Sequence, residues 1–247
     1  MATIVEMINP LTGLPEQVDK LDHTAQEIDD AVDLAPQLSN PNLLDNWYFG
    51  NPVNQRGQTS WVNPSDWQYA IDRWQITPSS VIALVDGGIT ITADFHQGLE
   101  KVRLEFGRTY TFSVLSSDGR LGKHTFVLTS DTEINADFGF GYFVCYLSGD
   151  SVWFRIYGDG STYKAAKLEL GSRQTLAHQD ADGNWVLNEI PDYGEQLARC
   201  QRYFQTFATE SLRPTNALDF RPVMRATPAL STITVSGKTL YTASADL

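Results

Sequence analysis

Three large aromatic side chains lie close together in the stretch GQTSWVNPSDWQYAIDRW, residues 57–74. Trp61, Trp67 and Tyr69 flank Asn-Pro-Ser-Asp, a string typical of turns, so at least two of these rings should lie on or beside an exposed loop. Flat rings pack against the C–H patches of sugars, and nearby amides can bind the surrounding hydroxyl groups. Alternatively, the rings pack on a neighbouring subunit or a sheet edge, and the sequence leaves both interpretations open.

A second aromatic cluster opens the stretch NWYFGNPVNQRG at residues 46–57. Three consecutive rings indicate burial on more than one face, so the chain should enter a core here. The polar run that follows needs a partner for every buried polar group. We therefore expect Trp47, Trp74 and Trp153 in the core, and we expect a polar loop that contains Asn54, Gln55 and Arg56.

Residues that could support catalysis form no recognisable constellation. The four histidines are scattered, and the chain lacks the His-x-His, His-Glu-x-x-His and Cys-x-x-Cys spacings of metal sites. Asp131, Glu133 and Asp137 form the densest carboxylate group and could pair for glycoside hydrolysis, but turn and strand-edge roles explain them as well. We predict a protein that is not an enzyme and that uses no metal and no cofactor.

The charge distribution argues against several classes of partner. The formal net charge is −12, and residues 1–38 hold eight acids against Lys20 as their only base. An acidic chain without a Lys/Arg cluster repels phosphate backbones, so we expect no nucleic-acid partner. The start of the sequence lacks the pattern of a signal peptide, and no apolar run reaches the roughly 20 residues of a membrane span. We therefore expect synthesis in the cytoplasm, no membrane insertion, and free thiols at Cys145 and Cys200.

A heptad pattern predicts a helix near the N-terminus. Apolar residues recur at alternating spacings of four and three, Pro15 suits a first helical turn, and Pro36 would end the run. Two apolar residues per heptad make a narrow seam, which favours self-association over packing on the following domain. The predicted oligomerisation positions are Leu14, Val18, Leu21, Ala25, Ile28, Val32 and Ala35.

From Leu43 to about Gly171 the sequence consists of short β-rich runs separated by turn residues. Asp-Gly-Gly at 86–88 and Ser-Asp-Gly-Arg at 117–120 carry the glycine chemistry of hairpin turns. Short strands at regular spacing without helical periodicity predict an antiparallel β-sandwich.

The remaining chain combines three kinds of segment. Residues 178–192 could form a hairpin with Trp-Val-Leu as its second strand, and residues 192–204 have helical periodicity. The β-like segment after residue 205 is too short to bury a core of its own, so it must pack on the sandwich or on another subunit. We predict a mainly β chain with domains at 1–40 (attachment and trimerising helix), 41–172 (β-sandwich) and 173–247 (linker, short helix and C-terminal β region).

Two motifs resemble known proteins. The first comprises NLLDNWYFGNPVNQRG at 42–57, IDRW at 71–74, FGRTYTFSV at 106–114 and GSTYKAAKLELG at 160–171. It resembles the jelly roll of galactose-binding-like carbohydrate-binding modules, above all those of bacteriophage tail-fibre and baseplate proteins. The second, more specific motif comprises KLELGSRQT, YGEQLARCQRYF and RPVMRATPAL within residues 167–230, and it is similar to the C-terminal part of the same phage proteins.

The resemblance implies a virion structural protein, a fibre or tail-tip component that trimerises through its N-terminal helix and adheres to the host. Its partners would be its own copies, other virion proteins at the N-terminal region, and a host cell-surface glycan. The glycan would be bound by Trp61, Trp67 and Tyr69 through ring stacking, and by Asn54, Gln55 and Arg56 through hydrogen bonds.

Two rival functions remain open from the sequence. One is a capsid or baseplate fibre or decoration protein whose jelly roll contacts only virion proteins. The other is a polysaccharide depolymerase, which requires two opposed carboxylates in a groove.

Overall fold

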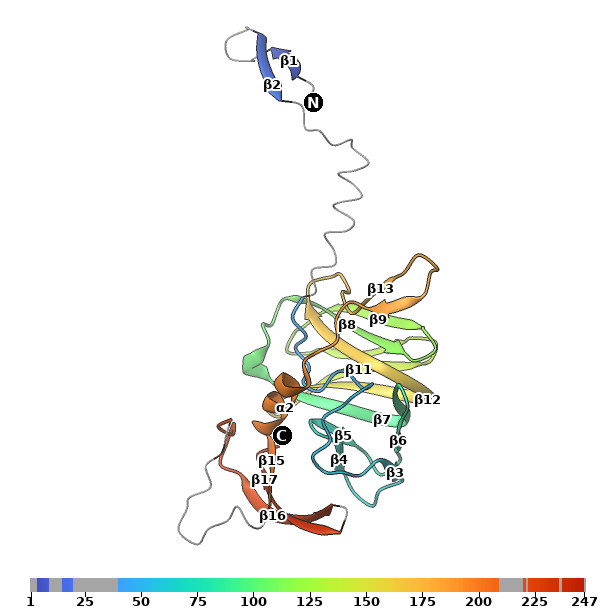
Figure 1. The fold of residues 1–247 in the computed structure, drawn as a ribbon, viewed down its shortest axis with the longest axis vertical. Coiled ribbons are helices and arrows are strands. Elements are labelled where there is room, and N and C mark those ends of the chain that lie inside the picture. Colours follow the sequence, from blue (N-terminus) through green and yellow to red (C-terminus); the bar gives the residue numbers. More distant parts are fainter. Residues whose placement is uncertain are drawn as a thin grey trace. The chain divides into compact units, whose positions relative to one another are not determined.

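The structure is a computed structural model that describes residues 4–8, 15–19, 40–208, 220, 222–235 and 237–246. The chain divides into two compact units, Met1–Leu38 and Ser39–Leu247. The second unit contains both the predicted sandwich and the predicted C-terminal region. The described elements are mainly β-strands, which pair in antiparallel sheets (Figure 1).

The first unit contains a two-stranded antiparallel pairing. Strand β1 (Ile4–Ile8) pairs with β2 (Pro15–Asp19), and Val5 lies opposite Val18. β-Branched residues favour strands, and proline is tolerated at the first residue of a strand, where Pro15 lies. The expectation that Pro15 and Val18 lie in the first turns of a helix is therefore not met.

The other predicted heptad positions lie outside the described residues, and the coiled coil itself stays a prediction. These positions are Leu14, Leu21, Ala25, Ile28, Val32 and Ala35.

The second unit is built on a ten-stranded sheet whose main path runs β10-β11-β12-β7-β5-β4. Strands β3, β6, β8 and β9 join this path at β7 and β12, and a short 3₁₀ helix, η2 (Lys101–Arg103), follows β7. The strands are β3 (Ser60–Val62), β4 (Gln68–Ile71), β5 (Trp74–Ile76), β6 (Val81–Val85), β7 (Gly88–Glu100), β8 (Thr109–Ser116), β9 (Leu121–Val127), β10 (Glu133–Asp137), β11 (Gly141–Ser148) and β12 (Ser151–Leu170).

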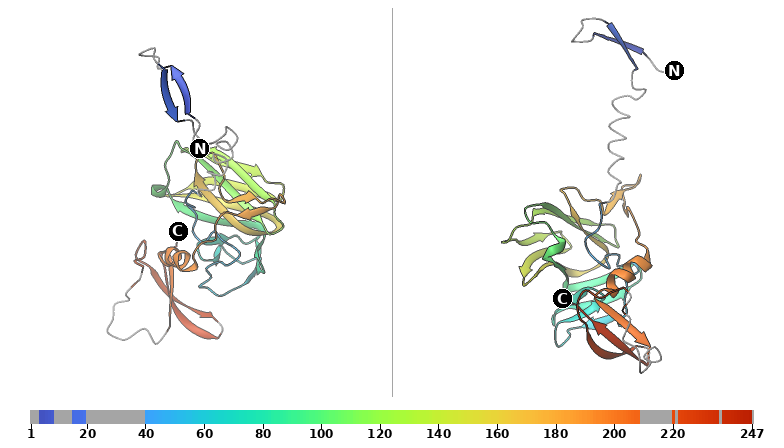
Figure 2. Two further views of the ribbon diagram at one scale, coloured as in Figure 1. Left: turned by 45° about the horizontal axis from the view of Figure 1, so that its top comes forward. Right: turned by 90° about the vertical axis from the view of Figure 1, so that its left-hand side faces the viewer.

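Strand β12 connects two parts of this sheet. Its residues from Ser151 to Tyr163 pair with β7, and from Tyr163 onward it pairs with β8. The register shifts between Asp159 and Thr162, where Gly160 has a φ of 100°, a conformation that favours glycine. The strand bends there, and the two parts of the sheet enclose one core, an arrangement consistent with a β-sandwich (Figures 1 and 2).

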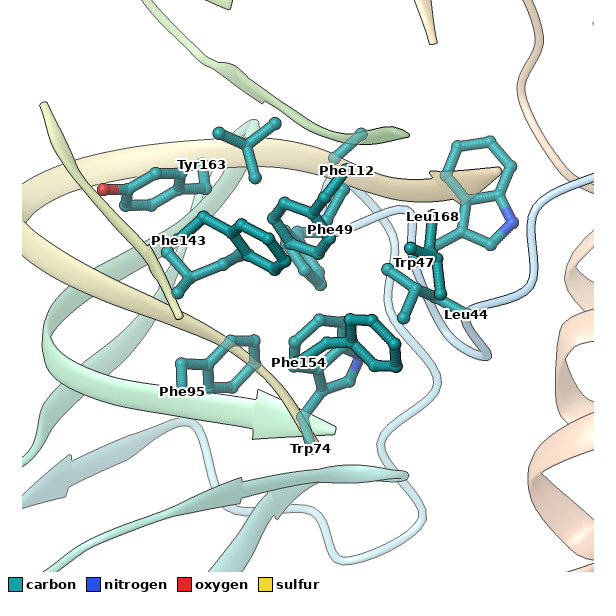
Figure 3. Packing of buried hydrophobic residues seen from close by; sticks show 14 of the residues in the cluster. Leu44, Trp47, Phe49, Trp74, Phe95, Phe112, Phe143, Phe154, Tyr163 and Leu168 are labelled. Carbon is teal, nitrogen blue, oxygen red and sulfur yellow. The ribbon is translucent and has the colours of Figure 1, made fainter. Parts of the chain in front are cut away.

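Aromatic side chains dominate that core (Figure 3). Trp74 stacks on Phe95 with ring centroids 4.7 Å apart, and Phe112 stacks on Phe143 at 4.2 Å. The predicted burial of Trp47 and Trp74 is confirmed. The chain beside Trp47 makes a single β-bridge with β12, between Tyr48 and Ala165.

The chain after the sandwich forms a hairpin, a helix and a small sheet. The predicted hairpin is confirmed as β13 (Ala177–Gln179) and β14 (Trp185–Leu187), and the predicted helix is confirmed as α2 (Tyr193–Gln201). Asp192 caps α2 by accepting a hydrogen bond from the Glu195 amide. A three-stranded sheet follows, in the order β15 (Phe204–Ala208), β17 (Lys238–Ser244) and β16 (Ala229–Val235). Cys145 and Cys200 are buried free thiols, as predicted.

A buried charge cluster holds α2 on the sandwich. The Asp45 carboxylate lies 3.2 Å from Arg73, 3.1 Å from Arg103 and 2.8 Å from Arg199 of α2. The Arg73 guanidinium lies 3.5 Å from the ring centroid of Tyr203. The early motif around Asp45 and the late motif around Arg199 are therefore bonded to one another in the fold.

Candidate functional site

The outer face of the sheet carries a continuous row of side chains from six paired strands. Strand register aligns these residues across β10, β11, β12, β7, β5 and β4. Five strand spacings of about 4.8 Å make the row about 24 Å long. Its members are Asn135, Val144, Arg155, His96, Gln75 and Tyr69.

A second row beside it presents two tyrosines. Tyr142 on β11 lies opposite Tyr157 on β12, and their rings meet edge to face with centroids 6.5 Å apart. Both side chains are exposed, Tyr142 to 43% and Tyr157 to 44%. Together with Asn135, Val144 and Arg155 they line a cavity of about 250 Å³.

Arg155 supplies the charge at this cavity. Its Nη1 atom lies 2.9 Å from an Asp94 carboxylate oxygen, and its guanidinium lies 5.9 Å from the Tyr157 ring centroid. The other oxygen of Asp94 accepts a hydrogen bond from the Thr77 hydroxyl at 2.9 Å. Both charges are thus fixed by neighbours, and Arg155 remains partly exposed toward the cavity.

Next to Arg155, two tryptophans contact His96. Trp67 stacks on the imidazole with ring centroids 4.9 Å apart and an interplanar angle of 19°, and Trp153 lies 5.5 Å away, tilted by 59°. Trp67 is 54% exposed, whereas His96 is fully buried. Burial lowers the pKa of His96 to about 4, with a smaller opposing effect from Asp94. The imidazole is therefore neutral near pH 7.

A glycine makes room for Trp153 on this face. Gly98 on β7 lies opposite Trp153, and a Cβ atom at Gly98 would come within 3.1 Å of the indole ring. Trp153 therefore lies half-buried over β7 on the outer face, and the prediction that it belongs to the core is wrong.

We call the set Trp67, His96, Trp153, Arg155, Tyr157, Tyr142 and Asn135 the aromatic face. Exposed rings with an arginine and an amide between them, and with the Asp94 carboxylate beside the arginine, match the composition of small-ligand sites, where apolar surface supplies contact area and a few polar groups set orientation. Such a surface can stack on the C–H side of a sugar and hydrogen-bond the hydroxyl groups around it.

Of the six predicted binding residues, Trp67 lies on the aromatic face and Tyr69 lies in the row that crosses it. The prediction that Trp61 presents its ring on a loop is wrong, because Trp61 is only 2% exposed. It lies in the middle of β3, and strand alternation turns its ring into the core while its two neighbours point outward.

Of the other three predicted residues, Gln55 and Arg56 lie at the junction with the C-terminal segment, and Asn54 lies in a local turn beside them. Gln55 donates hydrogen bonds to Asp72 at 2.6 Å and to the Phe204 carbonyl at 2.8 Å. Arg56 bridges Asp72 at 2.7 Å and Asp246 at 2.6 Å. Asn54 closes a turn by donating to the Gln58 carbonyl at 2.7 Å. Each of these polar side chains therefore has a hydrogen-bond partner within the protein, as we expected for the polar run that follows the buried rings.

Arg56 also connects this junction to the predicted aromatic residue Tyr69. Its guanidinium lies 4.7 Å from the Tyr69 ring centroid and 3.7 Å from that of Phe204. Burial, helped by the nearby Asp246 carboxylate, raises the pKa of Tyr69 to about 12. The structure therefore brings Gln55, Arg56 and Tyr69 together, but as part of an internal contact between the sandwich and the C-terminal segment.

Sequence reasoning missed most of the aromatic face, although a signal was present. Alternate residues of β11 read Tyr142, Val144, Tyr146, and alternate residues of β12 read Trp153, Arg155, Tyr157. The residues between them are apolar, so a period of two separates an inner from an outer face in each strand. Which strands are neighbours could not be read from that pattern.

No family model, no curated protein and no solved structure matches the chain. Within the described segments, no group of three or more His, Cys, Asp or Glu residues is placed to hold a metal ion. The same part of the chain contains no helix that combines the length and apolar character needed to span a membrane.

Proposed function

We propose that this chain is a structural protein of a bacteriophage virion, a homotrimeric fibre or tail-tip component whose β-sandwich is a jelly roll that binds a host cell-surface glycan through the aromatic face. The observation that carries the proposal is the exposed tyrosine pair, Tyr142 and Tyr157, at a cavity that also contains Arg155 and Asn135. The phage context rests on the sequence resemblance.

The charges around the cavity favour a neutral glycan. Arg155 is compensated by Asp94, and the neighbouring strand β10 adds the exposed carboxylates of Glu133 and Asp137. An acidic rim on an acidic chain repels polyanionic polysaccharides. Neutral sugars meet no such barrier, and weak single-site binding would be multiplied by three copies in a trimer.

The same carboxylates argue for binding over hydrolysis. Glu133 and Asp137 lie four residues apart on β10, a separation of about 14 Å along a strand. Glycoside hydrolases place their two carboxyl groups about 5 to 9.5 Å apart across the scissile bond. This spacing supports a binding protein that leaves the glycan intact.

A polysaccharide-binding assay tests the proposal. The full chain would be passed over four immobilised neutral polysaccharides, namely dextran, galactomannan, mannan and a neutral O-antigen polysaccharide freed of lipid A and core, with alginate as the polyanionic comparison. We expect retention on at least one of the first four and none on alginate. Tyr142→Ala combined with Tyr157→Ala should weaken binding by at least about 30-fold, because each stacked ring contributes about 1 kcal/mol or more.

Tyr241→Ala is the matched control, since Tyr241 lies on β17 away from the sandwich strands and is 40% exposed. It should bind as the wild type does. If the double variant also binds as the wild type does, the glycan site is not the aromatic face. If the wild type binds no polysaccharide but its rings become protected on assembly with other virion proteins, the rival capsid or baseplate role is the better one.

A further inference from the structure

The imidazole of His96 packs between two tryptophans, but its polar atoms make no hydrogen bond within the described part of the chain. Its side chain is fully buried, and neither ring nitrogen has a hydrogen-bond partner within the described part of the chain. Its cross-strand neighbour Arg155 has a buried Nε atom in the same condition. Buried polar groups are almost always hydrogen-bonded, because an unsatisfied one lowers stability. Two adjacent exceptions on the aromatic face therefore point to a missing partner.

The ring that covers His96 is not held in a strand. Trp67 follows the turn at 63–66 and precedes β4, and its backbone amide is bonded to the neighbouring Asp66 side chain. Trp67 is 54% exposed as a residue, and its indole ring is stacked on the imidazole. A side chain in this position can tilt away without breaking a strand pairing.

We infer that His96 and the Arg155 Nε atom form a buried subsite for a hydroxyl group of the glycan, with Trp67 as the movable ring that closes over it. This inference rests on the proposed glycan binding. It assigns specificity to His96, which the sequence did not single out.

The chemistry of the two groups defines the ligand. A neutral imidazole offers one donor and one acceptor, and the Arg155 Nε atom is a donor only. One hydroxyl group can donate to the acceptor nitrogen of the imidazole and accept from the Arg155 Nε atom at once. The imidazole N–H points in another direction and needs a second acceptor, such as a neighbouring sugar oxygen. A carboxylate or phosphate oxygen only accepts, and it would leave the imidazole acceptor unsatisfied. The subsite therefore selects neutral, hydroxyl-bearing sugars.

His96→Phe tests the inference, because phenylalanine keeps a flat ring under Trp67 and removes both nitrogens. We expect the thermal unfolding temperature to rise, since two unsatisfied polar atoms leave the interior. We expect affinity for the neutral polysaccharide that retains the wild-type chain, among dextran, galactomannan, mannan and the neutral O-antigen polysaccharide, to fall by about tenfold, the loss of one or two hydrogen bonds. A structural role alone would not move stability and binding in opposite directions.

His124→Phe is the control, because His124 lies on β9 and its ring also stacks on a neighbouring aromatic, Phe126. It should leave binding unchanged. Unchanged affinity in His96→Phe would overturn the subsite while leaving glycan binding in place. A lower unfolding temperature would overturn it too, because it would show that the nitrogens are bonded within the protein. A wild-type chain that binds none of the four polysaccharides would overturn both this inference and the proposed function.

Discussion

Arg56 joins two buried carboxylates that lie far apart in the sequence, Asp72 and Asp246. Asp72 is 1% exposed, Asp246 is 8% exposed, and Arg56 bonds both. Burial raises the pKa of Asp72 to about 6, although Arg56 and a hydrogen bond from Gln55 act in the opposite direction. Ionised Asp72 is therefore less favourable in the folded chain than in the unfolded one.

This shift has a definite sign in the pH dependence of stability. A carboxyl group whose pKa is higher in the folded than in the unfolded state binds its proton more tightly in the folded state. Protonated Asp72 therefore contributes fully to the free energy of unfolding below about pH 4, and this contribution is lost as the pH rises to about 6. Asp72→Asn cannot ionise and should lack this loss. In urea unfolding between pH 4 and pH 7, the free energy of unfolding of the wild type should fall by up to about 3 kcal/mol relative to that of the variant. Parallel curves for the two proteins would contradict the raised pKa.

Trp61 and Trp67 show that local sequence alone does not predict which of two neighbouring tryptophans is buried. Both flank the same turn, and local composition treats them alike. Trp61 lies inside a strand paired to β6, where alternation determines its direction, whereas Trp67 lies just outside β4. Only strand pairing separates the two, and that pairing depends on residues about 20 positions away in the sequence.

Asp45 is the charged centre of the contacts that hold helix α2 on the sandwich. Three arginines from three different segments converge on Asp45, and only one of them, Arg199, belongs to the helix. Burial alone would raise the pKa of Asp45, but the arginines outweigh it and hold the pKa below its usual value. The carboxylate is therefore ionised at neutral pH and balances buried positive charge.

Asp45→Asn should therefore be strongly destabilising. Removing one partner of a buried ionic cluster leaves uncompensated charge, which costs about 3 to 5 kcal/mol. Asp118→Asn is the control, since Asp118 pairs with Arg120 on the surface and such pairs contribute about 0 to 1 kcal/mol. Chemical denaturation of both variants measures the difference. Equal losses would contradict the structural role assigned to Asp45.

At the level of elements, local signals predicted more than long-range ones. The hairpin turns, the β13–β14 hairpin and α2 follow from turn residues and periodicity, and the structure has them. The bend of β12 and the order of the strands depend on pairings between distant segments, which a single sequence does not reveal. The aromatic face was missed for this reason, because its members come from separate strands.

For the whole molecule, trimerisation stays a prediction of the heptad pattern, and solution mass tests it. We expect the full chain to have the mass of a trimer by light scattering, and we expect a chain that starts at Asn40 to be a monomer, since residues 39–247 form a compact unit with its own core. A truncated chain that remains trimeric would assign assembly to the β regions. A monomeric full chain would contradict the trimer.

The central claim is that the aromatic face of the sheet binds glycan, and the indole N–H signals of the tryptophans test it most directly. Trp67 and Trp153 lie on this face, whereas Trp61 and Trp74 are buried in the core. Two-dimensional NMR during titration with a soluble form of the neutral polysaccharide that retains the chain should shift the signals of Trp67 and Trp153 and leave those of Trp61 and Trp74 unchanged. If that polysaccharide leaves the signals of Trp67 and Trp153 unmoved at concentrations where the chain is bound, the account is contradicted.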